Sequence, residues 1–338
     1  MRIGVAIEET WAFLHEIYDD LKSHHRTNLF QRRATSLPVF NVRANRYLLQ
    51  RDLGRFIRSN DVVFFEWASE LLAVASRLPK TCGIVTRLHR YELYQWADKI
   101  NWGAVDKVIL VSQAKRREFL GRFPGLESKV VVIPEAVSLT RFPYRPQPWR
   151  GNIGTLCHLK PRKRVYELVL AFHELAQERD DLHLHIGGGM ATNFEEYYLA
   201  LLNLVDKLDL HQRVTFHGAV SKPETWYPQV DIFVSNGYSE GLQVAPMEAM
   251  ASGCYTLSHF WDGAEELLPR QQLYYGDREL RQRILEYALS SDQQRAQWQA
   301  AMRQIVVDNF DVDTTKVQIR QAIEAAGTAR RPARGVLP

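Results

Sequence analysis

Residues 239–253 read SEGLQVAPMEAMASG and place two glutamates, Glu240 and Glu248, eight positions apart. Because proline is tolerated in the first turn of a helix, Pro246 predicts a helix start, and the Met-Glu-Ala-Met-Ala run favours its continuation. Gly253 can end that helix in a left-handed cap. Glu240 is therefore expected in a loop, and Glu248 within the helix that follows it.

This spacing suits an anionic ligand with hydroxyl groups at both ends. Eight helical residues span roughly 12 Å at about 1.5 Å per residue, and a bent entry loop shortens this to about the length of a sugar diphosphate with its ribose. One carboxylate can then accept hydroxyl hydrogens from a sugar and the other from a ribose. The N–H groups of residues 241–244, at the positive end of the helix dipole, suit the phosphates between them. The same residues also fit a surface helix with a solvated glutamate at each end.

The composition bounds the class of protein. At 338 residues the chain is long enough for two domains, and its 46% apolar and 24% charged residues are typical of a globular protein. No N-terminal apolar run flanked by basic residues is present, so we expect no signal peptide, no spanning helix and a cytoplasmic location. Cys82, Cys157 and Cys254 have no metal-ligand spacing and are expected to be buried thiols. The formal charge of +4 is mild, and we expect no nucleic-acid partner.

Segment 22–58 is strongly basic, since it holds nine Lys and Arg residues against Asp52 as its only acid. In the helix expected over 44–58, apolar residues form one side and arginines the other. Such a helix can lie on anionic lipid or bind an anionic acceptor, so peripheral contact with a membrane is one interpretation. The other is a helix that packs its leucines on its own sheet and exposes its arginines to solvent.

Short β-branched runs alternate with amphipathic helical stretches along the chain, which predicts an α/β fold with two doubly wound parallel sheets. The proline-rich segment 142–149 lies between the two series and is the best candidate for a linker. In such sheets ligands bind beyond the carboxyl ends of the strands. The expected strands are 2–7, 39–42, 61–65, 83–87, 107–111 and 129–133 in the first series, and 152–156, 182–186, 213–216, 231–235 and 255–258 in the second.

Two further loops of the second series suit a phosphate ligand. Residues 157–164 read CHLKPRKR and bring four cationic side chains to a helix start, where a diphosphate finds both charge and N–H donors. Lys163 is the expected point charge on a departing phosphate. The glycines at 187–189 follow the next strand and allow the backbone to approach a ligand. Each loop alone also fits a structural interpretation, as a solvated basic turn and a tight turn.

In this order and spacing, the motifs resemble the retaining family 4 glycosyltransferases (glycosyl transferases group 1), which have the GT-B fold. The resemblance covers nearly all of residues 105–325. It is carried by 129–137, by Lys163 eight residues before Ala171-Phe172, and by 187–189, 214–220, 231–234, 239–253 and 263–266.

The resemblance implies two Rossmann-like domains facing a cleft, an acceptor-side domain over 1–143 and a nucleotide-sugar domain over 150–310. A helix over 311–326 would return to the first domain, and 327–338 would be a tail. The implied reaction moves a hexose from a nucleoside-diphosphate sugar to an acceptor hydroxyl with retention of configuration, in glycan, glycolipid or glycoside synthesis. The acceptor would be a saccharide, a lipid-linked molecule or a small molecule. Neither a cofactor nor a metal is expected, because the departing phosphate can take the acceptor proton.

The same resemblance implies roles for individual residues. The catalytic set would be Glu240 on the donor sugar, His89 on the reacting sugar and Lys163 on the diphosphate. Glu248 would hold the ribose hydroxyls, and Val220 would pack near the base. The donor site as a whole would comprise Glu248, Arg162, His158, Gly188, Val220, Gly241, Leu242, Gln243 and Val244. The acceptor side would comprise Glu8, Trp11, Glu66, Trp67, Arg87 and Arg90.

Four places depart from the family pattern. Cys157 or His158 replaces an arginine, and residues 242–243 are Leu-Gln where the family has Phe-Gly. Residues 262–263 are Asp-Gly where the family has Gly-Gly, and residues 8–9 are Glu-Glu in place of a glycine-rich loop. These two carboxylates would repel a donor unless they face an acceptor hydroxyl or a basic partner such as Arg87 or Arg90. The alternative function is therefore a catalytically weak or silent relative that binds a sugar nucleotide or a partner. A dinucleotide-dependent dehydrogenase is a weaker rival, because no G-x-G-x-x-G follows the first strand.

Overall fold

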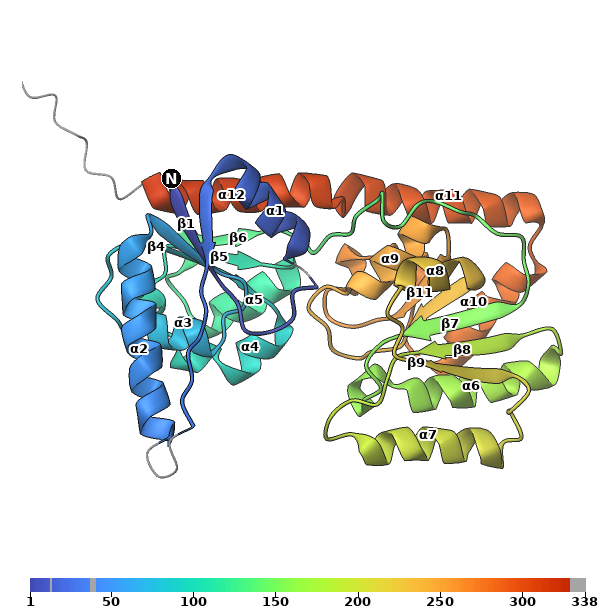
Figure 1. Cartoon of the computed structure of the whole chain (residues 1–338). Helices are drawn as coiled ribbons and strands as arrows, with labels where there is room; N and C mark the ends of the chain where they lie inside the picture. The colour runs from blue at the N-terminus through green and yellow to red at the C-terminus, as the bar shows by residue number, and fades with distance from the viewer. Residues whose placement is uncertain (13, 37–40, 329–338) are drawn as a thin grey trace, which may run out of the picture. The chain divides into compact units, whose positions relative to one another are not determined.

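The computed structural model describes residues 1–328 except residue 13 and residues 37–40. The chain divides into two compact units (Figure 1). The first comprises Met1–Glu135 with the described residues from Asp313 onward, and the second comprises Ala136–Val312. The proline-rich segment 142–149 therefore belongs to the second unit, where the Phe142 ring packs edge-on against Tyr227 with centroids 6.0 Å apart.

The first unit is built on a six-stranded parallel sheet with the strand order β2-β1-β3-β4-β5-β6. Because every pairing is parallel, the carboxyl ends of these strands share one edge of the sheet. The strands are β1 Arg2–Ala6, β2 Arg26–Leu29, β3 Val62–Phe65, β4 Gly83–Leu88, β5 Lys107–Leu110 and β6 Val130–Val132. The helices are α1 His15–His24, α2 Asn41–Ser59, α3 Glu70–Ala75, α4 Arg90–Gln95, the short η1 Ala97–Lys99, α5 Gln113–Arg122 and α12 Val312–Thr328.

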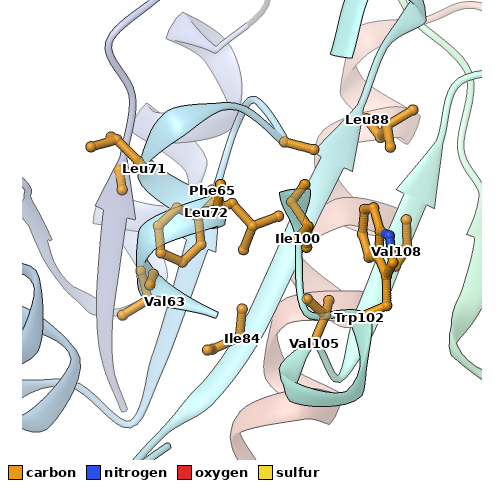
Figure 2. Close-up of a cluster of buried hydrophobic side chains, with 14 of the residues drawn as sticks. Val63, Phe65, Leu71, Leu72, Ile84, Leu88, Ile100, Trp102, Val105 and Val108 are labelled. Atoms are coloured by element: carbon orange, nitrogen blue, oxygen red, sulfur yellow. The ribbon is translucent and has the colours of Figure 1, made fainter. Parts of the chain in front are cut away.

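Alternate residues of the central strands face opposite helical layers. Val63 and Phe65 of β3 belong to a buried apolar cluster with residues of α2, α3 and α5. Figure 2 shows both residues with Leu71 and Leu72 of α3. Val62 and Phe64 belong to a second cluster with residues of α1 and α12. A strand covered on both faces requires a continuous apolar run, which explains the sequence Val-Val-Phe-Phe.

Helix α12 belongs to the first unit although it follows the second unit in the chain. Ile319, Ile323 and Ala326 are buried in the same cluster as residues of α1, and Figure 1 shows α12 beside α1. Arg320 Nε donates to an oxygen of Asp20 in α1 at 2.8 Å. The predicted return of the C-terminal helix is therefore confirmed.

The second unit has its own six-stranded parallel sheet, in the order β12-β11-β10-β7-β8-β9. Helix α6 contacts α7 and α10, whereas α9 contacts α11 and the short helix η5. The strands are β7 Asn152–Leu156, β8 His183–Gly187, β9 Val214–Gly218, β10 Ile232–Ser235, β11 Tyr255–His259 and β12 Leu273–Tyr274. The helices are α6 Val165–Glu178, α7 Glu195–Lys207, α8 Pro223–Trp226, η5 Tyr227–Gln229, α9 Val244–Ser252, α10 Asp277–Leu289 and α11 Asp292–Asn309.

The α/β fold with two parallel sheets is confirmed, but one predicted strand is wrong. Residues 41 and 42 begin helix α2, and residues 39 and 40 lie outside the described residues. The edge of the first sheet is instead β2, whose partly exposed Arg-Thr-Asn-Leu sequence lacks a β-branched run. Among the cysteines, Cys82 and Cys254 are buried as predicted, whereas Cys157 is only partly buried.

Candidate functional site

The two glutamates of the second unit lie where the sequence predicts them. Strand β10 ends at Ser235, α9 holds Pro246 in its first turn, and Gly253 follows that helix with a left-handed φ of 104°. Glu240 therefore lies in the connecting loop and Glu248 in the helix. This loop leaves the carboxyl end of β10, which is the sheet edge where parallel α/β folds bind ligands.

The Glu240 side chain is buried between two cations. Its Oε1 lies 2.8 Å from Lys163 Nζ and 2.5 Å from Arg162 Nη1. Burial raises a carboxyl pKa, but the charges of Lys163 and Arg162 outweigh it and hold the pKa of Glu240 below its usual range. We name these three residues the loop cluster. It unites two motifs that are 77 positions apart in the sequence.

Further hydrogen bonds fix the two loops of this cluster to each other. Arg162 also donates to the carbonyl of Ser239, and Asn236 Nδ2 donates to the carbonyl of Arg164 at 2.9 Å. Arg164 adopts left-handed backbone with φ of 51° and is the N-cap residue of α6. The backbone therefore preorganises the loop cluster, in addition to the attraction between its charges.

Gly188 is required by the shape of the turn after β8. Its φ is 127°, and a Cβ at this position would lie 1.8 Å from the carbonyl oxygen of Cys157. Cys157 N also donates to the carbonyl of Gly187 at 3.0 Å, so this turn lies directly against the basic loop. Val220 borders the same turn, because a Cβ on Gly187 would lie 3.2 Å from its Cγ2.

His158, which stands near the place of the family's arginine, is exposed. Partial desolvation and the neighbouring charges of Lys160 and Lys163 lower its pKa below the ordinary value. The imidazole is therefore neutral at pH 7. The positive charge of this loop comes from its lysines and arginines.

Glu248 faces the hydroxyl group of a buried tyrosine. Tyr227 Oη donates to Glu248 Oε2 at 2.8 Å. Burial raises the pKa of Glu248 to about 7, although the hydrogen bond from Tyr227 opposes this rise. Such a carboxylate can accept hydrogen bonds from ligand hydroxyl groups, and its ionisation changes near neutral pH.

The first unit holds a second group of charges at the carboxyl ends of its strands. We name it the buried cluster. Arg87 Nε donates to Glu66 Oε1 at 2.9 Å, and Arg87 Nη1 lies 3.4 Å from Glu135 Oε2. His89 Nε2 lies 2.8 Å from Glu135 Oε1, and its Nδ1 lies 3.3 Å from Glu92 Oε1. Because a carboxylate oxygen faces each ring nitrogen, both nitrogens carry protons and His89 is an imidazolium.

Burial and pairing set the protonation states of this cluster. Burial lowers the pKa of an imidazole, but the carboxylates of Glu135 and Glu92 outweigh this effect and raise the pKa of His89 to about 9. Burial raises the pKa of Glu66 to about 7 despite the nearby Arg87. Although burial also acts on Glu135, the charges of Arg87 and His89 hold its pKa below the usual range. The cluster therefore keeps a positive imidazole inside the protein at neutral pH.

The other predicted acceptor-side residues have partners on neighbouring elements. Glu8 pairs with Arg32 at 3.1 Å, a residue that sequence reasoning did not connect with it. The remaining contacts are aromatic or join the loop after β1 to the rest of the unit. The Trp67 and His89 rings are tilted by 31° with centroids 4.0 Å apart, and Trp67 Nε1 donates to the Thr10 carbonyl. Trp11 packs on Tyr18, Glu9 accepts from Tyr91 Oη, and the Arg90 guanidinium lies over the Tyr94 ring.

Sequence reasoning missed Glu92 and Glu135, although both carried a signal. Glu135 follows β6 by three residues, at the same sheet edge as His89. Glu92 stands three residues after His89, and its carboxylate accepts from the His89 backbone N–H at 3.2 Å, as in a capping box. Both positions follow from the rule that functional side chains gather at strand ends and helix starts.

In the described part of the chain, no group of three or more His, Cys, Asp or Glu residues is arranged to hold a metal ion. None of the helices in that same part is long and apolar enough to cross a membrane.

Comparison with known proteins shows similarity to glycosyltransferases in both sequence and structure. Residues 150–286 match the family described as "Glycosyl transferases group 1". The alpha-monoglucosyldiacylglycerol synthase of Streptococcus pneumoniae is 25% identical over 228 residues, which cover 61% of this chain and 50% of that protein. The D-inositol 3-phosphate glycosyltransferase of Kineococcus radiotolerans is 27% identical over 165 residues, which cover 44% of this chain and 38% of that protein. The crystal structure of Anabaena Alr3699/HepE in complex with UDP and glucose has a TM-score of 0.76 at 18% identity, covering 96% of this chain and 100% of that one.

These findings define a protein of the GT-B fold. Residues 150–286, which contain the loop cluster and Glu248, match the family of glycosyl transferases group 1. The chain spans half or less of the length of the two curated relatives described above.

Proposed function

We propose that the chain transfers a hexose from a nucleoside-diphosphate sugar to an acceptor hydroxyl, with retention of the anomeric configuration. The loop cluster carries this proposal: a buried carboxylate is paired with Lys163 and Arg162 at the entry to α9, the helix that also bears Glu248. The names of two relatives, a glucosyldiacylglycerol synthase and an inositol phosphate glycosyltransferase, support it. So does a structural neighbour that binds UDP and glucose.

In this proposal the donor exchanges partners with the loop cluster. The diphosphate takes Lys163 and Arg162, while Glu240, released from them, accepts hydrogen bonds from the sugar hydroxyls. Residues 241–244 hold the phosphate through backbone N–H groups, and Glu248 holds the ribose. Lys163 offsets the charge that grows on the phosphate as the bond to the anomeric carbon breaks. The same phosphate takes the acceptor proton as the new bond forms, so the scheme uses neither a metal nor a protein nucleophile.

The first unit supplies the acceptor side in this proposal, with the charge of His89 as its central feature. His89 is 8% exposed and is the member of the buried cluster with the most solvent contact. Its imidazolium presents a fixed positive charge to oxygen atoms of the reacting sugar. Glu66 and Arg87 are 0% and 1% exposed and pair with each other, so we assign them a positioning role.

A thermal-shift panel of UDP-, GDP- and ADP-sugars tests the donor assignment, because a ligand that binds only the folded state raises Tm. We expect one nucleotide class to stabilise the chain. Glu248→Ala should then weaken nucleotide binding in calorimetry, whereas Glu240→Ala should mainly lower turnover. Unchanged nucleotide affinity in both variants contradicts the assignment.

A silent relative that only binds a sugar nucleotide is the second candidate. The neutral His158, in place of a permanent arginine charge, favours it. Hydrolysis of the donor in the absence of acceptor separates the two functions. An active enzyme releases free hexose slowly, at a rate that EDTA leaves unchanged, whereas a silent relative binds the donor and releases none.

A further inference from the structure

A groove of about 700 Å³ lies along α2, α3 and η1 of the first unit, and none of its lining residues belongs to the buried cluster. Helices α2 and α3 contact each other here, and Figure 1 shows them side by side. Six apolar side chains line the groove: Val42, Leu49, Ala73, Val74, Leu78 and Trp96. A groove of this size accommodates a ligand that is apolar along much of its length.

Cationic side chains surround this apolar floor. Arg46, Arg77 and Lys99 line the groove and are exposed. The Lys99 ammonium lies 4.3 Å from the centroid of the Trp96 ring, and Arg77 Nη2 donates to the carbonyl of Lys99 at 2.9 Å. These contacts hold two positive charges at the edge of the apolar surface.

The single acid of the groove is already neutralised. Glu70 Oε2 accepts from Arg32 Nη1 at 2.7 Å. Among the lining residues, Arg32 is therefore paired with Glu70. The other three cations, Arg46, Arg77 and Lys99, have no acidic residue in the lining to pair with. Three guanidinium or ammonium groups around an apolar floor match a ligand that is anionic at one end and apolar at the other.

Arg32 also locates the groove within the unit. Besides Glu70, it pairs with Glu8, which follows the carboxyl end of β1. One side chain thus links the wall of the groove to the sheet edge at which the acceptor-side residues lie.

We propose that this groove binds a phosphate group attached to a single apolar chain. The chain covers Leu49, Leu78 and Trp96, and the phosphate takes Arg46 and Lys99. For the reaction, the proposal implies that the acceptor is a saccharide joined to an apolar chain through phosphate, and that the groove holds the chain and the phosphate. This part rests on the proposed function. Binding of the phosphate and its chain to the groove does not require the nucleotide-sugar donor.

The binding step is tested by calorimetry with dodecyl phosphate, decyl phosphate and octyl phosphate, each below its micellar concentration. We expect decyl phosphate to bind about tenfold tighter than octyl phosphate, because each buried methylene adds to affinity. Inorganic phosphate and the uncharged dodecyl maltoside should each bind at least tenfold more weakly than dodecyl phosphate. Equal binding of inorganic phosphate and dodecyl phosphate, or of the maltoside and dodecyl phosphate, overturns the proposal.

Two double variants with the same change in charge locate the site. Arg46→Glu with Lys99→Glu should weaken dodecyl phosphate at least tenfold. Arg55→Glu with Arg58→Glu makes the same change in charge on α2, at exposed residues outside the groove lining, and should leave binding within about twofold. Equal losses in both double variants indicate a general attraction to the basic surface and overturn the proposal.

Two further measurements distinguish failure of the groove proposal from failure of the proposed function. Circular dichroism establishes that each double variant is folded, and Trp96→Phe should abolish the change in tryptophan fluorescence caused by dodecyl phosphate. The thermal shift caused by the nucleotide sugar should be the same in the Arg46/Lys99 variant as in the native chain. Loss of dodecyl phosphate binding with an intact nucleotide shift thus tests the groove alone, whereas absence of any nucleotide shift tells against the proposed function.

Discussion

The charged cluster of the first unit is buried and rich in acids, whereas that of the second unit is partly exposed and rich in bases. In the buried cluster, two cations, Arg87 and His89, meet the carboxylates of Glu66, Glu92 and Glu135, and all five residues are less than 9% exposed. In the loop cluster, Lys163 and Arg162 share the single carboxylate of Glu240, and their side chains are 17% and 19% exposed.

This difference indicates two uses of charge. The buried cluster pairs each of its two cations with buried carboxylates, so it maintains a protonation state and a geometry. The loop cluster has more positive than negative charge and partial access to solvent, so it can exchange its internal partner for an anion. Removal of a charge should therefore cost stability in the first unit and ligand binding or turnover in the second.

The largest expected effect is on stability, in Arg87→Met. The substitution leaves Glu66 and Glu135 without the guanidinium that pairs with both, and removal of one partner from a buried ion pair costs about 3–5 kcal/mol. Urea unfolding of Lys163→Met serves as the control, since Arg162 remains beside Glu240 and the loss should stay within about 1 kcal/mol. Similar losses in the two variants would remove the distinction between the clusters.

The next effect is on turnover, in Lys163→Met. Loss of a positive charge that stabilises a departing phosphate should lower kcat about 100-fold, in line with the removal of one preorganised group. Lys160→Met, in the same loop but outside the loop cluster, should lower kcat less than threefold. Steady-state kinetics with the donor from the thermal-shift panel measures both. A Lys163 variant with native kcat and a raised KM would make this residue a binding group only.

The loop cluster was predictable in part because of the sheet topology. Lys163 follows β7 and Glu240 follows β10, and these strands are neighbours in the second sheet, so the loops after them meet. The motifs therefore indicated one ligand for both residues. Their direct ion pair was not predicted, because strand and helix patterns do not specify which side chains pair across two loops.

The surroundings of Glu8 were not predictable for a related reason. The carboxyl ends of β1 and β2 are adjacent, which brings Arg32 beside Glu8. Since β2 has a polar, partly exposed sequence, the pattern predicted a strand at 39–42 and none at 26–29, and Arg32 had no predicted neighbour. Errors at a sheet edge thus propagate to the side chains of the loops that follow it.

A third prediction concerns the pH dependence of stability in Glu135→Gln. The pKa of His89 in the folded chain, about 9, is above the ordinary value of 6.5, so the folded state binds this proton more tightly than the unfolded state. The corresponding stability is complete below about pH 6.5 and is lost as the pH rises through 9. Without the carboxylate that faces Nε2, the variant should lose about 2 kcal/mol at pH 7 and show a flatter decline from pH 6.5 to 9.

Urea unfolding at several pH values measures this prediction, and ¹⁵N NMR of the imidazole gives the state of His89 directly. Glu135→Asp, which keeps the charge, should restore most of the slope between pH 6.5 and 9. A native slope in Glu135→Gln would show that Glu92 alone holds the proton on His89, and Glu135 would then have no positioning role.

The smallest expected effect is the pH dependence of donor affinity through Glu248. Because the pKa of this carboxyl is about 7 in the unliganded chain, roughly nine-tenths of the molecules hold it protonated at pH 6 and roughly nine-tenths hold it ionised at pH 8. Ribose hydroxyls donate better to the ionised form, and apparent affinity scales with the competent fraction. The Kd of a nucleoside-diphosphate sugar, whose diphosphate does not titrate in this range, should therefore fall about tenfold from pH 6 to pH 8. Calorimetry of Glu248→Gln should show a flat profile and Glu240→Gln the native slope. A native slope in Glu248→Gln would place the titrating group elsewhere and remove Glu248 from the ribose site.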